Sequence, residues 1–322
     1  MYFLLIFGLR LPSTKGNATA MDSAEEKENI VAGIIWMVIT GLMFVAVTGI
    51  VRHVGSSIPA AEAAFIRYLF GAALMVPFLH KMFKKKRSKF VYSIFAIRGF
   101  SHALGVILWF YAMARITLAE VTAIGYVSPI FVTLGAALFL GEKLALRRVL
   151  AVIIAFLGAL IILRPGFREI EIGHLAQLCT APLFAISYLL TKFMTKTEDP
   201  IVIVGMLTIF VTIGLAPFAI LQWVTPSAEE VAWLALVAVF ATGGHYTMTR
   251  ALKVAPIMVT QPIHFLQLVW ATSLGLLVFA EPLDVFVLIG GGVIILAVTF
   301  ISYREAKLNS KSKTPTPITT KN

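Results

Sequence analysis

Long apolar segments, repeated from one end of the chain to the other, constrain its fold more than any other feature. The 322 residues are 59% hydrophobic and only 13% charged, whereas a soluble domain is nearer half apolar and a quarter charged. A hydrocarbon layer about 30 Å thick needs roughly 20 apolar residues per helical crossing, because every backbone N–H and C=O must be hydrogen-bonded within the segment. We therefore expect an all-α, polytopic membrane protein.

The apolar runs between charged residues and Pro or Gly breaks predict ten transmembrane helices. Their expected ranges are 30–51, 60–80, 91–114, 118–140, 147–164, 173–194, 200–223, 229–250, 255–280 and 283–303. The connections between them are short, as at Arg115–Thr117, so successive helices should pack as antiparallel neighbours. Continuous runs such as Leu150–Leu163 lack the alternating segments of about 10 residues that a transmembrane β-barrel would show.

The distribution of positive charge predicts how the chain is oriented. If the amino terminus is cytoplasmic, 21 of the 27 Lys and Arg residues fall on the cytoplasmic side. The exceptions are Arg52, Arg115, Arg164 and Arg168 on the other side, and Arg67 and Arg98 within spans. This bias follows the positive-inside rule, so we expect a multi-pass inner-membrane protein with both termini in the cytoplasm. The net charge of +11 then indicates contact with anionic headgroups rather than with nucleic acid.

The ends of the chain, its cysteine content and its lack of catalytic motifs give little further information about function. Residues 1–29 are expected to be a flexible segment, with Met21 as the true start, and the polar tail 304–322 is expected to be disordered. A single cysteine, Cys179, excludes an internal disulfide and a Cys-rich metal site. No phosphate-binding loop, metal-binding pair or nucleophile elbow is found. We expect no metal, no cofactor and no enzyme activity.

An internal repeat divides the predicted spans into two groups of five. The sequence Tyr-Ala-Met-Ala-Arg from Tyr111, at the end of the third span, recurs as Tyr-Thr-Met-Thr-Arg from Tyr246, at the end of the eighth. Glu142 after the fourth span is matched by Glu281 after the ninth. Because each group has an odd number of helices, the two must have opposite orientations. Many secondary transporters use such inverted repeats to build two alternately exposed routes to one central site.

These features resemble a known family of carriers. The paired five-helix halves, with Pro129 in the fourth span and Glu142 just after it, are similar to the EamA-type members of the drug/metabolite transporter superfamily. The resemblance covers about residues 30–303 and implies two EamA-like repeats, over 30–164 and 173–303. The second half departs from it by carrying two prolines, at 256 and 262, in place of one matching Pro129.

A closer likeness is to the S-adenosylmethionine uptake carriers within that family. It is carried by Glu-Ala-Ala-Phe-Ile-Arg-Tyr from Glu62, by Arg98-Gly99, and by Trp-Phe-Tyr from Trp109. The resemblance implies secondary-active transport of a small organic metabolite, with S-adenosylmethionine or a similar cationic or planar solute as the favoured substrate. Because one fold serves many solutes, an amino-acid or vitamin carrier and a drug exporter remain alternatives. A membrane-embedded enzyme or scaffold is the alternative outside transport.

Ionisable residues inside predicted spans are the first candidates for function, because such a group costs about 2.5 kcal/mol or more if it faces lipid. Arg67, Arg98 and Glu120 are therefore predicted to act in gating or in charge pairs. Each has a simpler alternative. Arg98 could extend to the headgroups, Arg67 could pair with Glu62, and Glu120 could pair locally with Arg115.

A second set of candidates combines aromatic rings with hydrogen-bonding edges. The predicted substrate-binding residues are His102, Trp109, Tyr126, His245, Gln261, His264, Gln267 and Trp270. Those in the ninth span recur at three-residue steps and should line one flank of the helix. Aromatic faces attract a cation by roughly 0.5–2 kcal/mol, so these walls suit a planar or cationic solute. The alternative is interhelical polar contacts, which contribute about 0.6 kcal/mol each.

Small residues in the fifth and tenth spans predict close helix packing. Ala151, Ala155 and Ala159 recur at four-residue steps, next to Gly158, and the tenth span contains Gly290–Gly292. Such residues let helix backbones approach closely. Because these spans occupy the same place in each half, we expect them to pack away from the solute, as a candidate homodimer face. The expected partners are thus a small solute, the lipid bilayer and a second copy of the chain.

Overall fold

The computed structural model describes residues 30–128, 130–131, 146–167, 169–255, 260 and 263–312. Several residues named from the sequence fall outside these ranges, namely Pro129, Glu142, Arg168, Pro256, Gln261 and Pro262, together with the segments 1–29 and 313–322.

The described part of the chain is built from helices joined by short connections. The first half contains α2 (Ile30–Val54), α3 (Ala60–Met75), the 3-10 helix η1 (Val76–Phe78), α4 (Leu79–Phe83), α5 (Lys89–Met113), α6 (Leu118–Gly125) and α8 (Leu146–Leu163). The second half contains α9 (Ile172–Met194), α10 (Pro200–Leu221), α11 (Ala228–Val254), α13 (Leu266–Val278) and α14 (Val285–Ser312). The predicted all-α fold is confirmed.

Length and composition match a membrane-spanning bundle. Six of the described helical segments are long and apolar enough to cross a membrane, and three shorter helices are also apolar. Large apolar side chains such as Leu221, Leu277 and Leu296 are exposed on the outside of the bundle. An exterior of this kind is stable only against lipid, because large contiguous apolar patches are rare on soluble proteins.

The carboxyl end of the chain differs from the sequence-based expectation. Helix α14 does not end at residue 303 but continues to Ser312, so the prediction of disorder from residue 304 is wrong for 304–312. The segment that follows Tyr303 reads Arg-Glu-Ala-Lys-Leu, and all five residue types have high helix propensity. An already formed apolar helix can therefore extend into this polar segment without paying the cost of a new nucleus.

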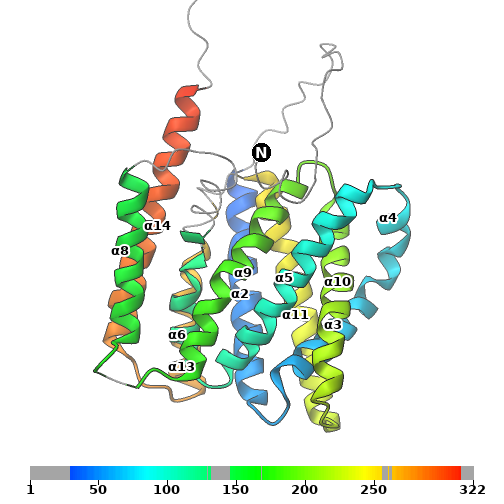
Figure 1. The fold of residues 1–322 in the computed structure, drawn as a ribbon, viewed down its shortest axis with the longest axis horizontal. Helices are drawn as coiled ribbons and strands as arrows, with labels where there is room; N and C mark the ends of the chain where they lie inside the picture. Colours follow the sequence, from blue (N-terminus) through cyan, green and yellow to red (C-terminus); the bar gives the residue numbers. More distant parts are fainter. Residues whose placement is uncertain are drawn as a thin grey trace, which may run out of the picture.

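The helices of the two halves pair in a symmetric pattern (Figure 1). Helix α2 packs on α11, and the equivalent of α2 in the second half, α9, packs on α5. Three further pairs join equivalent helices, α3 with α10, α6 with α13 and α8 with α14. Exchanging the halves leaves this set of pairs unchanged, and equivalent helices run in opposite directions, since α2 descends in Figure 1 and α9 ascends. The chain is therefore an inverted repeat, as predicted, and residues on α3, α5, α9 and α11 meet near its centre.

Helices α8 and α14 form one edge of the bundle, at the left of Figure 1. A Cβ atom added to Gly158 would lie 2.8 Å from the carbonyl oxygen of Gly290, and one added to Gly290 would lie 2.5 Å from the carbonyl oxygen of Gly158. The two backbones are thus in direct contact, which only glycine permits. The predicted close packing of the fifth and tenth spans is confirmed.

Candidate functional site

Four residues singled out from the sequence meet between the two halves. Arg67 on α3, Arg98 and His102 on α5, and His245 on α11 are all buried, and they are called the central cluster below. The imidazole rings of His102 and His245 lie 5.1 Å apart, and both rings are close enough to both arginines to interact electrostatically. His102 Nδ1 lies 3.1 Å from the hydroxyl oxygen of Ser187 on α9. Both repeats therefore contribute to the cluster.

Aromatic rings surround the central cluster. The ring of Phe184 on α9 lies 5.0 Å from that of His102, and Trp109 contacts Phe184 in turn, at 6.1 Å between centroids. Phe44 of α2 lies edge-on to His245, with 5.2 Å between the ring centroids. These rings provide flat apolar faces beside hydrogen-bonding imidazole edges, the combination that commonly orients a small ligand.

The two arginines of the cluster form no ion pair with any carboxylate of the described residues. The guanidinium of Arg67 lies over the ring of Tyr68, 3.7 Å from its centroid. Arg98 Nη1 donates to the backbone carbonyl of Ile203 at 2.8 Å, and its Nε has no hydrogen-bond partner. Arg98 is only 1% exposed, so it does not extend to the headgroups.

The proposed pairing of Arg67 with Glu62 is also not observed. One carboxylate oxygen of Glu62 instead accepts a hydrogen bond of 2.8 Å from the backbone N–H of Val224. Glu62 lies in the first turn of α3 and Val224 in the connection between α10 and α11. The carboxylate therefore joins the two halves at one end of the bundle and leaves the arginine to the centre.

A large cavity opens at the end of the bundle where α9 and α11 finish and α10 begins, the upper end in Figure 1. We call this the open end. The cavity has a volume of about 1530 Å³, and it extends inward along α11 as far as Thr242 and Gly243. It therefore reaches the level of His245, one turn away on the same helix. The Cβ that Gly71 of α3 lacks would lie 3.3 Å from the Thr242 hydroxyl, so α3 and α11 approach each other at this depth.

The mouth of this cavity is strongly basic. Its lining includes eight cationic residues, Lys81, Lys84, Lys85, Arg87, Lys192, Lys196, Arg250 and Lys253, against the two carboxylates Glu198 and Asp199. One carboxylate is already engaged, because Arg87 donates two hydrogen bonds to Glu198 at 2.8 and 3.0 Å. A concave surface with this excess of one charge concentrates solutes of the opposite sign.

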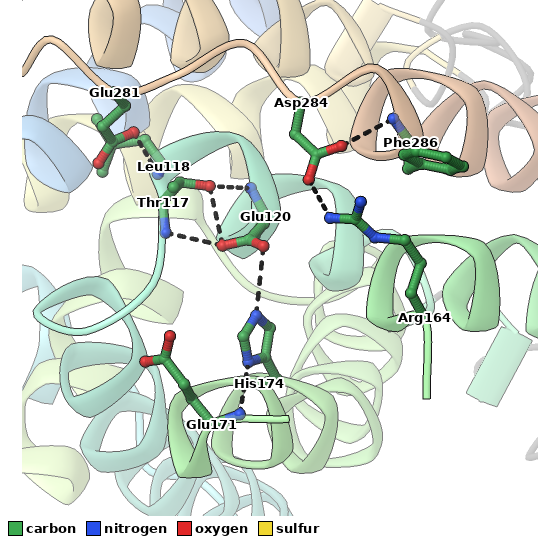
Figure 2. A network of polar contacts seen from close by, with 9 residues as sticks. All are labelled: Thr117, Leu118, Glu120, Arg164, Glu171, His174, Glu281, Asp284 and Phe286. Carbon is green, nitrogen blue, oxygen red and sulfur yellow. Dashed lines mark hydrogen bonds and ion pairs between the residues drawn. The ribbon is translucent and has the colours of Figure 1, made fainter. Parts of the chain in front are cut away.

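The opposite end of the bundle, the closed end, is held by polar links between the halves (Figure 2). One carboxylate oxygen of Glu281 accepts a hydrogen bond of 2.9 Å from the backbone N–H of Leu118, the first residue of α6. The other oxygen forms a 3.1 Å ion pair with Arg52 at the end of α2. Glu281 thus caps a helix of the other repeat, where the helix dipole also favours a negative charge.

A second link joins Glu120 to His174 of the second half. Glu120 Oε2 accepts hydrogen bonds of 3.0 Å from both the N–H and the hydroxyl of Thr117, and Oε1 lies 3.3 Å from His174 Nε2. The backbone N–H of Glu171 donates to His174 Nδ1, so Nε2 carries the proton that faces Glu120. The sequence had suggested a local pair between Glu120 and Arg115, and the structure does not form it. The Arg115 guanidinium instead lies over the Tyr111 ring.

A third link joins the ends of the α8–α14 pair. The guanidinium of Arg164, just after α8, donates to the carboxylate of Asp284, just before α14. The same guanidinium lies 4.6 Å from the ring centroid of Phe286. Figure 2 draws the three links close together, and they lie where α6, α9 and α14 begin, at the lower end in Figure 1. The closed end is therefore held by contacts between side chains and helix termini of opposite repeats.

The other predicted site residues lie along the contact between α6 and α13. The Tyr126 hydroxyl donates to the Phe265 carbonyl at 3.1 Å, and its ring lies 6.2 Å from that of His264. Gln267 is a buried residue of α13. Trp270 instead packs on α2, where a Cβ added to Gly41 would lie 2.7 Å from its ring. The predicted single wall is therefore divided between two helix interfaces.

Sequence reasoning did not single out several residues that the structure places at these sites. Tyr68, Phe184 and Ser187 adjoin the central cluster, and His174 and Asp284 lie in the closed end. Tyr68 stands in the Glu62–Tyr68 motif and His174 begins a predicted span, so both carried a weak signal. The others gave none, because only the pairing of distant helices brings them to the polar groups.

An inverted helical repeat with a deep cavity at one end and a sealed opposite end defines a class of membrane transporters. A family model described as the EamA-like transporter family matches residues 31–164 and again residues 171–303. The chain belongs to this family, which is part of the drug/metabolite transporter superfamily.

Curated relatives match nearly the whole chain. A riboflavin transporter of Vibrio cholerae is 25% identical over 293 residues, 89% of this chain and 98% of that protein. A riboflavin transporter of Rhizobium johnstonii is 30% identical over 294 residues, 89% of this chain and 96% of that protein. An S-adenosylmethionine uptake transporter of Rickettsia felis is 25% identical over 282 residues, 87% of this chain and 95% of that protein.

A solved crystal structure shares the fold. It superposes with a TM-score of 0.57 at 15% identity, covering 86% of this chain and 97% of that chain. Taken together, the family and its relatives indicate that the chain is a multi-pass membrane protein that transports small metabolites.

Proposed function

We propose that this chain is a secondary-active carrier that moves a small organic metabolite across the inner membrane by alternating access. The observation that carries the proposal is the difference between the two ends. A cavity of about 1530 Å³ opens at one end, while polar links between the repeats seal the other. In an inverted repeat the two halves can exchange these conformations, which would close the open end and open the closed one.

The orientation predicted from the sequence makes this an inward-facing conformation. The open end carries the Lys and Arg residues of the predicted cytoplasmic side, in agreement with the positive-inside rule. Both termini are then cytoplasmic, and the closed end faces the opposite side. Impermeant labelling of single cysteines placed near Lys85 and near Phe167 tests this orientation. Labelling of the Lys85 position from outside intact cells would reverse it.

The rings of the central cluster favour a solute with a planar heterocycle. His102 and His245 offer ring faces and hydrogen-bonding edges, and the cavity lining reaches Thr242 and Gly243, one turn from His245. Trp109 adds a further ring through its contact with Phe184, and stacking on such rings is favourable for flat ligands. S-adenosylmethionine and riboflavin, which relatives are named for transporting, both contain fused ring systems. They are therefore the first two solutes to test.

Uptake into proteoliposomes is the direct test. Purified protein should give saturable, substrate-specific flux, and His102→Phe should reduce it strongly because this substitution removes the contact with Ser187. The matched control is His80→Phe, since His80 is exposed on α4 and should leave flux unchanged. A broad metabolite panel that gives no flux with monodisperse protein would refute the carrier. Lipid turnover by the same preparation would favour a membrane-embedded enzyme instead.

We also propose that the chain forms a homodimer along α8. Apolar side chains of this helix, including Leu150, Ile153 and Leu157, are exposed although α14 covers its glycine face. Burying such a surface against a second copy would exchange lipid contacts for close helix packing. Native mass spectrometry in a mild detergent tests the proposal, and a monomer at every protein concentration would contradict it.

A further inference from the structure

The two arginines of the central cluster are deeply buried, yet they have few hydrogen-bond acceptors around them. Arg67 is 4% exposed and Arg98 is 1% exposed. The Arg67 guanidinium stacks over the face of the Tyr68 ring. Arg98 donates one hydrogen bond to a backbone carbonyl oxygen, and its Nε has no hydrogen-bond partner. A buried guanidinium without a counter-ion is costly, and such groups normally pair with a carboxylate or act on a substrate.

The side chains that face these arginines supply no negative charge. The titratable groups around them are Tyr68 on α3, His102 on α5 and His245 on α11, and no Asp or Glu of the described residues interacts with either guanidinium. His245 Nδ1 is buried and has no hydrogen-bond partner. The cluster thus presents positive charge and unsatisfied polar atoms to one small volume.

The basic cavity leads to this volume. Val204 lines the cavity, and the residue before it, Ile203, provides the carbonyl that holds Arg98. On α11 the cavity lining includes Tyr246, which follows His245, and Thr242 and Gly243, which precede it. A solute that enters at the open end therefore passes a cationic mouth and then meets residues that adjoin His245 and Ile203 in the chain.

We infer that Arg67 and Arg98 bind an anionic group of the transported solute, a carboxylate or a phosphate. Guanidinium groups present several N–H donors in a fixed plane that matches the oxygens of both anions. The anion would supply the missing counter-charge, while the rings of Phe184 and Trp109 would contact the apolar part of the solute. This inference rests on the proposed function, since it takes the central cluster as the solute site. It adds an anionic group to the cationic or planar solute that the sequence favours.

Paired probes that differ only in the anionic group test the inference on the purified full chain. Nicotinate is compared with nicotinamide, and riboflavin 5′-phosphate with riboflavin, by isothermal titration calorimetry and by thermal stabilisation in nanodiscs. The anionic member of at least one pair should bind at least about tenfold more tightly, because hydrogen bonds to charged groups are the stronger ones. The first pair reports a carboxylate and the second a phosphate.

Variants assign the preference to the arginines. Arg67→Gln and Arg98→Gln should each remove most of the difference within the pair, and Arg98→Lys should keep part of it because the charge remains. The matched control is Arg115→Gln, which removes an exposed guanidinium at the closed end and should preserve the full difference. If the glutamine variants do not fold, the lysine variant and the paired probes on the unmodified chain still test whether the arginines bind the anionic group.

Several results would overturn the inference. These are equal binding of both members of both pairs, an anion preference that survives both glutamine substitutions in folded protein, and no stabilisation by any anionic probe. Failure of the carrier proposal is distinguishable. Arginine-dependent anion binding without flux would keep the anion site and refute the carrier, whereas saturable flux of neutral solutes with no anion preference would keep the carrier and refute the anion site.

Discussion

Replacing Glu281 by glutamine should weaken the seal at the closed end. The Glu281 side chain is 8% exposed, and its two oxygens contact different parts of the other repeat. One accepts from the Leu118 N–H at 2.9 Å and the other pairs with Arg52 at 3.1 Å. Glutamine keeps an oxygen acceptor for Leu118 and has nearly the same volume, but it loses the negative charge that both contacts use.

The expected magnitude follows from these two contacts. A hydrogen bond to a charged group contributes about 1.5–3 kcal/mol and a neutral one about 0.5–1.5 kcal/mol. The Arg52 side chain is 24% exposed, so water partly screens its ion pair with Glu281, and losing this ion pair adds little. We therefore expect the closed conformation to lose about 1.5 kcal/mol relative to the conformation opened at this end. That free energy corresponds to roughly a tenfold change in the ratio of the two populations.

Cysteine accessibility measures this ratio directly. The chain has one cysteine, so Cys179→Ser gives a background without thiols. Val121→Cys then places a thiol one turn beyond the start of α6, where the native side chain is 2% exposed. An impermeant maleimide should label this position about tenfold faster in the Glu281→Gln protein, because only the opened conformation exposes it.

The control removes a different carboxylate from the same end. Glu229→Gln changes an exposed residue in the first turn of α11. Among the described residues, the Glu229 carboxylate accepts a side-chain hydrogen bond from Trp233 of the same helix and from no residue of the other repeat. Labelling of Val121→Cys should stay at the unmodified rate in this protein. If the Glu281 and Glu229 variants were labelled equally fast, the links between the repeats would not control opening, and the reasoning would be refuted.

Three further predictions concern stability. Gly290→Leu should lower the thermal stability by the equivalent of about 1–3 kcal/mol, since a side chain there meets the backbone of Gly158; an unchanged melting curve would contradict the backbone contact. Glu198→Gln leaves the 2% exposed Arg87 side chain without its ion pair and should cost about 3 kcal/mol in the same measurement. Thr40→Val removes a 2.8 Å hydrogen bond between α2 and α11, and it should cost only about 0.6 kcal/mol, so a loss above 2 kcal/mol would be unexpected.

Much of the fold could be predicted because the bilayer imposes a strong local rule on the sequence. Each crossing must be a helix of nearly fixed length, so the predicted spans 30–51 and 173–194 differ from α2 and α9 by only a few residues. Helix ends at connections also had local signals, such as the Thr117 and Ser227 capping boxes. The continuation of α14 to Ser312 was missed because beyond the membrane the apolar criterion no longer applies.

The candidate site was only partly predictable, because it depends on which helix faces meet. The cost of exposing Arg67 and Arg98 to lipid indicated that both face inward, and both are buried. The same argument could not identify their neighbours. For Glu120 the sequence offered Arg115, which is close in the chain, as the alternative local partner, whereas the structure pairs it with His174, 54 residues away. Trp270 was grouped with the histidines, but its helix turns it toward α2.

By itself, the sequence determined the class of protein, the number and ends of most spans, and the inverted repeat. These follow from composition, from segment length and from two short repeated motifs, and each is a local or a periodic property of the chain. The tertiary structure alone decided which end is open and which carboxylates link the repeats at the other end. It also brought Arg67 and Arg98 to the same two histidines, with no carboxylate counter-ion among the described residues. Those features arise from contacts between helices far apart in the chain, and such contacts depend on how the two repeats pack rather than on any one segment.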